Sequence, residues 1–185
     1  MWPWGHAAVG YIAYSLYVRR DGRRPTAVAV VALAIGTQFP DLVDKPLGWT
    51  LGILPGGRTL AHSLLTFAVV GVAVLYVARH YRQRPLGVAF LIGYLSHTLS
   101  DGLYAAIDGE FADLTYLLWP VLPMPEYETE QSFLAHFQNL ALDSTVTFEF
   151  GLVALAAILW ILDGYPMLSA FRTAIRDRFW RTDTR

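Results

Sequence analysis

The sequence has no cysteine and little charge. Of its 185 residues only 16% are charged and 55% are hydrophobic, compared with roughly 25% and 45–50% in an ordinary soluble domain. The absence of cysteine excludes a disulfide framework and a thiolate metal site. The formal net charge of -1 argues against a basic nucleic-acid-binding module, so we expect no nucleic-acid partner. The composition as a whole argues against an aqueous globular protein.

The hydrophobic residues are gathered in long runs separated by short charged loops. The runs cover about residues 2 to 18, 26 to 43, 60 to 78, 86 to 107 and 146 to 162. A transmembrane helix needs about 20 mostly apolar residues, with about 17 near the lower limit. The sequence therefore predicts an all-α, polytopic membrane helical bundle of about five transmembrane helices. In the second run Pro40 disfavours a helix at Phe39, so we expect this helix to stop short of the outer surface.

The arginines predict the orientation of this bundle. Twelve of the 14 basic residues follow the first, third and fifth runs, which alternating spans place on one side. They are Arg19, Arg20, Arg23, Arg24, Arg79, Arg82, Arg84, Arg172, Arg176, Arg178, Arg181 and Arg185. Short basic loops stay cytoplasmic, so we predict a multi-pass protein of the cell membrane with its N-terminus outside and its C-terminus in the cytoplasm.

Two further segments are expected to lie along the membrane surface. Residues 111 to 123 are apolar but too short to span, which indicates an outer interfacial piece. In residues 166 to 185, apolar side chains at helical spacing oppose arginines, which is typical of an amphipathic helix on anionic lipid. We therefore predict a single transmembrane domain over residues 1–165 and a cytoplasmic, amphipathic basic tail over 166–185.

Ionisable residues stand at the predicted outer ends of four runs. They are His6 in the first, Asp41 and Asp44 in the second, Arg58 and His62 in the third, and His97 and Asp101 in the fourth. Charged groups at this depth are costly unless they face protein or a partner. Because alternating spans bring all of these ends to one side, we expect the side chains to converge.

The spacing within the runs supports this convergence, although simpler explanations exist for each pair. His97 and Asp101 are four residues apart and share a helix face, which also suits a plain hydrogen bond between helices. Asp41 and Asp44 are three apart, and Lys45 could neutralise them without a metal.

Imidazole and carboxylate groups without thiolates form a nitrogen and oxygen ligand set. Such a set suits a divalent transition metal, Zn²⁺ first, with Mn²⁺ or Fe²⁺ as alternatives. The predicted ligands are His6, Asp41, Asp44, His62, His97 and Asp101, which suffice for one metal ion or for two that share an aspartate. Asp44 is a ligand or the general base, and Arg58 holds an anionic group of the substrate unless it only forms a salt bridge with the acidic outer loops.

Four other ionisable residues carry no assigned role. His80 lies in the predicted cytoplasmic basic loop and is given no chemistry. Glu149 lies just inside the fifth run, where it could face the same site. The roles of His136, Asp143 and Glu149 are left open.

Four motifs in the first 120 residues resemble one known family. WGHAAVGY, FPDLVD, RTLAHSLL and GYLSHTLSDGL are similar to segments of the YdjM-like, predicted membrane-bound metal-dependent hydrolases. The resemblance covers about residues 5 to 120. It implies a multi-span helical protein with a metal site near one membrane face and hydrolase activity.

These observations predict an integral membrane metal-dependent hydrolase. We expect it to act on an ester or phosphoester of an amphiphilic, lipid-like substrate near the outer membrane face, with membrane lipids as its surroundings. Two alternatives come from other classes of protein. One is a transporter or channel for a divalent metal or protons, and the other is a structural bundle in which the polar cluster only joins helices.

Overall fold

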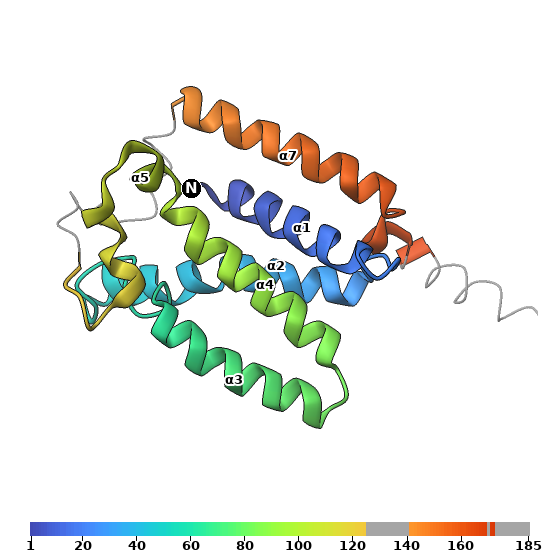
Figure 1. Ribbon diagram of the computed structural model, residues 1–185, viewed down its shortest axis with the longest axis horizontal. Helices are drawn as coiled ribbons and strands as arrows, with labels where there is room; N and C mark the ends of the chain where they lie inside the picture. Colours follow the sequence, from blue (N-terminus) through green and yellow to red (C-terminus); the bar gives the residue numbers. More distant parts are fainter. Residues whose placement is uncertain (125–140, 170, 173–185) are drawn as a thin grey trace, which may run out of the picture.

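The computed structural model describes residues 1–124, 141–169 and 171–172, and within these ranges every regular element is a helix. The five long helices of the described residues lie side by side (Figure 1). They are α1 (Pro3–Arg19), α2 (Ala27–Lys45), α3 (Leu64–His80), α4 (Arg84–Asp101) and α7 (Ser144–Leu162). The all-α prediction is confirmed for the described residues.

The long helices have lengths close to those of membrane spans. They contain 17 to 19 residues, or roughly 26–28 Å at about 1.5 Å per residue. By length and composition, two described segments, Ala27–Thr50 and Ser144–Leu162, could cross a membrane, and Leu64–His80 is a shorter apolar helix. The number of spans therefore stays a prediction.

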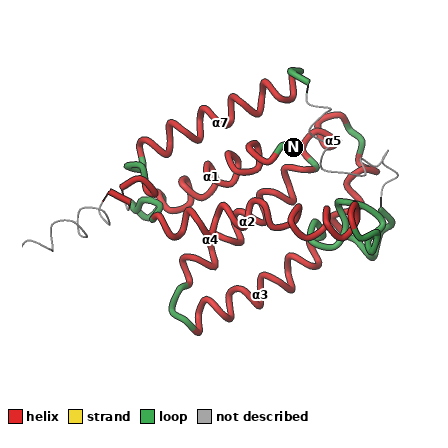
Figure 2. Tube along the Cα trace, turned by 180° about the vertical axis from the view of Figure 1, so that it is seen from behind, coloured by secondary structure: helices red, strands yellow, loops and turns green. Residues whose placement is uncertain are grey.

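Short helices gather at the end of the bundle where α1 begins (Figures 1 and 2). A π-helix, η1 (Pro46–Thr50), continues from α2, and α5 (Leu103–Asp108) follows α4. A 3-10 helix, η2 (Phe111–Leu118), occupies the segment that was predicted to be interfacial. The predicted basic tail lies mostly outside the described residues.

The starts of three long helices follow from side chains that cap them. Thr26 accepts a hydrogen bond from the backbone N–H of Ala29, and Ser63 accepts one from Leu65. Asp143 caps α7 by accepting from the N–H of Val146 at 2.8 Å. Such caps satisfy backbone donors that have no partner within the helix. Asp143, whose role the sequence left open, is thus a helix cap.

Helix α2 does not end near Pro40, so the expectation of a shortened second helix was wrong. The helix continues to Lys45 and joins η1 without a break. Proline removes one backbone hydrogen bond, the one to the carbonyl of residue i−4, which here is Gly36. Packing of α2 against α4 along this stretch outweighs that loss, and the extra turn brings Asp41 and Asp44 onto the buried face.

Two glycines allow the backbones of α2 and α4 to touch. A Cβ at Gly36 would collide with the carbonyl oxygen of Phe90, and one at Gly93 would lie 2.5 Å from the carbonyl oxygen of Leu33. Small residues of this kind permit close helix approach in membrane proteins. The contact fixes the distance between Asp41 on α2 and His97 on α4.

At the opposite end of the bundle, Asp163 attaches α7 to α1. Its carboxylate accepts hydrogen bonds from the hydroxyls of Tyr11 and Ser15 at 2.9 and 2.8 Å, and it pairs with Arg19 at 2.7 Å. Asp163 is only 5% exposed, so these partners compensate its charge.

We predict that Gly93→Ala destabilises the protein while Gly151→Ala does not. The methyl group at position 93 meets backbone atoms that cannot move aside, so the helices must separate at a cost of about 2 kcal/mol. At Gly151 on α7 a Cβ would meet nothing within 4 Å, and alanine is the better helix former. Thermal unfolding of the detergent-purified variants measures the difference, and equal stability of the two variants would contradict the close-contact explanation.

Candidate metal centre

Two aspartates and two histidines meet at the end of the bundle where α1 begins. Each offers one ligand atom, and these four atoms lie within 4.8 Å of one another. Asp41 comes from α2, His62 from the segment before α3, and His97 and Asp101 from α4. Both histidines are fully buried, and the two aspartates are 8% exposed. Side chains from three parts of the chain thus form one group that could bind a metal ion.

His97 presents Nε2 to this group because its other ring nitrogen is engaged. Nδ1 lies 2.7 Å from the main-chain carbonyl oxygen of Thr37 on α2. A carbonyl oxygen can only accept, so Nδ1 carries the proton. In the neutral ring, Nε2 then keeps its lone pair for a metal ion.

Asp44 orients His62 in the same way. Its Oδ2 lies 2.8 Å from Nδ1 of His62, and the carboxylate also accepts from the backbone N–H groups of Thr59, Ala61 and His62 at 2.8, 2.8 and 3.2 Å. These bonds turn Nε2 of His62 toward the cluster. Asp44 was predicted as a ligand or general base, but it lies behind His62 and outside the four-residue group.

The four ligand atoms face one another without donors between them. The Nε2 atoms of His62 and His97 are 3.1 Å apart, and Oδ2 of Asp101 is 3.3 Å from Nε2 of His62. Oδ1 of Asp41 has no hydrogen-bond partner among the described residues, while its Oδ2 accepts from Lys45 at 2.6 Å. Lone pairs that converge in a buried site repel unless a proton or a cation lies between them.

His6 lies against this group from α1. Its ring stacks on His97 with centroids 3.7 Å apart, and Nε2 lies 3.1 Å from Oδ1 of Asp101. Nδ1 is 2.9 Å from the hydroxyl of Ser100, which itself donates to the carbonyl of His97. Nδ1 therefore carries the proton, and Nε2 of His6 is a third imidazole nitrogen with its lone pair directed at the aspartate.

Asp101 is the residue that joins these parts. Oδ1 faces His6 and accepts from the N-terminal ammonium of Met1 at 3.1 Å, and Oδ2 faces the other two histidines and Nε of Arg58, which is 3.0 Å away. Arg58 was predicted to hold an anionic substrate group or to form a salt bridge. It forms an ion pair here, with a carboxylate of the cluster itself.

A cavity of about 230 Å³ gives access to Asp101 and Arg58. Its other lining residues are Met1, Tyr104, Ala105, Asp108, Glu110 and Asp113. Three of them are acidic, so the cavity attracts cations toward the cluster and disfavours a strongly anionic ligand.

Of the remaining residues without an assigned role, Glu149 lies near the site and His80 lies away from it. Glu149 is fully buried and accepts from the backbone N–H of Trp2 at 3.1 Å, which joins α7 to the start of α1. His80 lies at the far end of α3, away from the cluster. His136 lies outside the described residues.

Sequence analysis did not single out three residues that support the site. The hydroxyl of Tyr94 donates to the carbonyl of Ala61, and that of Tyr116 donates to the carbonyl of Thr98. Ser100 orients His6. Tyr94 and Ser100 stand three residues before and after His97, so their helical spacing was a usable signal. Tyr116 had none, because it comes from a segment without periodicity.

The donors of this centre fit a transition metal. Imidazole nitrogen and carboxylate oxygen without sulfur suit Zn²⁺, Mn²⁺ or Fe²⁺. Each histidine is oriented by a hydrogen bond from its other nitrogen, which is the usual arrangement around protein-bound metals.

The fold and the site define a class of protein: a helical bundle with a buried histidine and aspartate centre at one end. The family model described as YdjM inner membrane protein matches residues 1–171. The chain therefore belongs to this family, which confirms the predicted resemblance and makes it a membrane protein. Neither the curated proteins nor the solved structures contain a match.

We predict that Asp44→Asn weakens metal binding about 10- to 100-fold, as the loss of such outer hydrogen bonds does elsewhere. The amide keeps the shape but no longer fixes the proton on Nδ1 of His62. Competition with a chelator followed by elemental analysis measures the affinity. Asp21→Asn, which changes an exposed carboxylate paired with Arg23, is the control and should bind metal like the unmodified protein.

Proposed function

We propose that this protein is an integral membrane metal-dependent hydrolase. The observation that supports the proposal best is the convergence of three imidazole Nε2 atoms on two carboxylates beside a cavity. His6, Asp41, His62, His97 and Asp101 would hold the metal ion, for which zinc is the first candidate and manganese or iron the alternatives.

We further propose that the five long helices all cross the membrane. Large apolar side chains on the surfaces of α3 and α7, such as Val69, Val72 and Ile158, are exposed, which suits contact with lipid. Within the described residues, the arginine-rich loops that follow α1 and α3 lie at the end of the bundle away from the cluster. By the positive-inside rule, the cluster then faces outward and the C-terminus lies in the cytoplasm.

A bound divalent ion supplies Lewis-acid activation of water and of an ester or phosphoester oxygen. The chain's own residues supply orientation and charge. Asp44 and the carbonyl of Thr37 fix the rings of His62 and His97, and Ser100 fixes His6. Arg58, whose side chain is 34% exposed, lines the cavity and could bind an anionic group of the substrate through its guanidinium.

The position of the cavity favours an amphiphilic substrate. Its polar part would enter the cavity at the end of the bundle, while its apolar part would remain in the adjoining membrane. Because Asp108, Glu110 and Asp113 surround Arg58, we expect a headgroup with at most one negative charge near the metal. A neutral ester or a phosphodiester meets this condition.

Transport of a metal ion or proton is the second candidate, and the arrangement of polar groups favours it less. A pathway needs polar groups along its whole length. Between the cluster and the opposite end, the bundle is packed with Tyr14, Val30, Leu33 and Ala89, which belong to one buried apolar cluster. This apolar packing in the middle of the described bundle favours a site closed toward the opposite end over a transport pathway.

We predict that the detergent-purified protein contains transition metal in near-stoichiometric amount and that His97→Ala combined with Asp101→Asn removes it. His97→Ala removes an imidazole ligand and Asp101→Asn replaces a charged carboxylate by a neutral amide, so hydrolysis of bis(p-nitrophenyl) phosphate or p-nitrophenyl esters should fall at least 100-fold. His80→Ala, which changes a histidine at the far end of the bundle, is the control.

Each rival function gives a different outcome in this experiment. Full metal retention by the double variant would reject the site. Metal uptake into proteoliposomes that is abolished by His62→Ala would favour transport, and absence of metal together with unfolding of the variants would favour a purely structural cluster.

We predict that the two ends of the bundle lie on opposite sides of the membrane. The chain has no cysteine, so single cysteines can be introduced without a background. Ile53→Cys should react with a membrane-impermeant thiol reagent in intact cells, and Asp21→Cys only after permeabilisation. Labelling of both positions in intact cells would contradict the proposed topology.

A further inference from the structure

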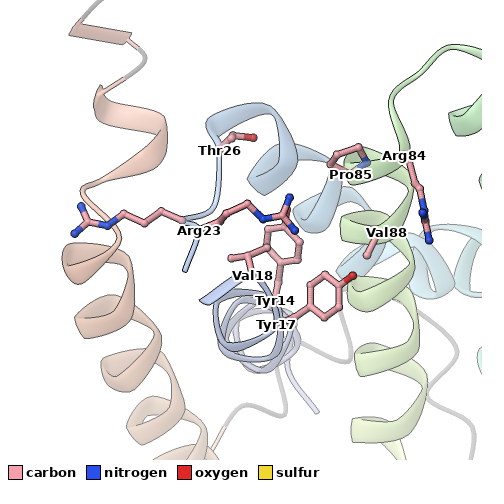
Figure 3. Close-up of a pocket in the computed structure, with 9 residues that line it drawn as sticks. Tyr14, Tyr17, Val18, Arg23, Thr26, Arg84, Pro85 and Val88 are labelled. Atoms are coloured by element: carbon pink, nitrogen blue, oxygen red, sulfur yellow. The ribbon is translucent and has the colours of Figure 1, made fainter. Parts of the chain in front are cut away.

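A second cavity lies at the other end of the bundle from the metal centre. It has a volume of about 370 Å³, within the range of about 300–1,000 Å³ that is usual for small-ligand sites. It lies where α1 ends and where α2 and α4 begin (Figure 3). Its lining residues are Tyr14, Tyr17, Val18, Arg23, Arg24, Thr26, Arg84, Pro85 and Val88.

The charged residues that line this cavity are all basic. Arg23 pairs with the nearby Asp21, but both side chains are about 60% exposed, and exposed pairs of this kind contribute little. Among the described residues, Arg24 and Arg84 form no ion pair. The cavity therefore carries a positive charge that nearby carboxylates do not balance.

The helix ends at the cavity add to this positive potential. Thr26 caps α2, a helix of 19 residues, and Arg84 and Pro85 begin α4, a helix of 18 residues. Neither helix has an acidic residue in its first turn. No acidic side chain in these first turns therefore compensates the partial positive charge of the two helix N-termini, which can attract an anion from outside the helices.

The inner wall of the cavity is apolar and aromatic. Tyr14 and Val18 are 3% and 7% exposed, and Pro85 and Val88 stand opposite them on α4. A phosphate ion alone needs no such wall. A phosphate ester does, because its organic part would pack on the tyrosine rings and valines while its oxygens face the arginines.

We propose that this cavity binds the phosphate group of an anionic phosphoester. In the proposed topology it lies at the cytoplasmic membrane surface, where basic pockets between helices bind the headgroups of anionic phospholipids. A phospholipid is therefore the source that the position favours, and a soluble phosphoester is the other source of the same chemistry. The proposal is independent of the hydrolase, because the two sites lie at opposite ends of the bundle.

The test compares two triple variants with the same change in charge. Arg23, Arg24 and Arg84→Gln removes the arginines that line the cavity. Arg20, Arg79 and Arg82→Gln removes three exposed arginines at the same end that do not line it. Binding of short-chain phosphatidylglycerol to the detergent-purified proteins is measured by native mass spectrometry, with phosphatidylcholine as the neutral lipid.

We expect the unmodified protein and the second variant to bind phosphatidylglycerol alike, and the first variant to bind it at least tenfold more weakly. Inorganic phosphate and glycerol phosphate form a separate arm. If they bind as tightly as the lipid and only the first variant loses them, the site stands and its ligand is soluble. Equal losses in both variants, or equal binding of phosphatidylcholine, would overturn the proposal. Thermal unfolding of both variants shows that they are folded.

Discussion

The central constraint on the histidine and aspartate cluster is that two imidazole nitrogens face each other. Nε2 of His62 and Nε2 of His97 are 3.1 Å apart, and each ring has its proton held on the other nitrogen, by Asp44 and by the carbonyl of Thr37. Neither nitrogen can donate to the other in its neutral form. A cation between them and the carboxylates of Asp41 and Asp101 removes the conflict, and the surrounding bundle is arranged to keep these atoms together.

Bringing these atoms together leaves helix α2 with one backbone hydrogen bond fewer, and close packing of the helices compensates for that loss. Pro40 deprives α2 of a hydrogen bond one residue before Asp41, and the contact of Gly36 and Gly93 with the facing backbones holds the helix in place. Asp44, on the same helix, accepts hydrogen bonds from backbone N–H groups of the loop that carries His62. Helix packing and loop anchoring thus act on the same centre from two sides.

The sequence was sufficient to predict the helical class, the family and the convergence of Asp41, His62, His97 and Asp101. The alternation of apolar runs is enough to predict the convergence, because it brings specific helix ends to one side. It could not separate Asp44 from the four residues that could bind a metal, since both aspartates of FPDLVD stand at helical spacing where either could face the bundle interior. The difference arises from the loop before α3, whose backbone N–H groups surround only Asp44.

The same limit explains why the partner of Arg58 and the course of α2 through Pro40 were not foreseeable. Local rules give proline a fixed penalty, and the compensation comes from α4, some 50 residues along the chain. Arg58 meets Asp101 because the chain folds back over the end of α4, which no periodicity records. Where a side chain is oriented by contacts within its own helix, sequence spacing is a sound guide. Where it is oriented by a distant loop or backbone carbonyl, only the folded chain determines whether it binds a metal or positions a residue that does.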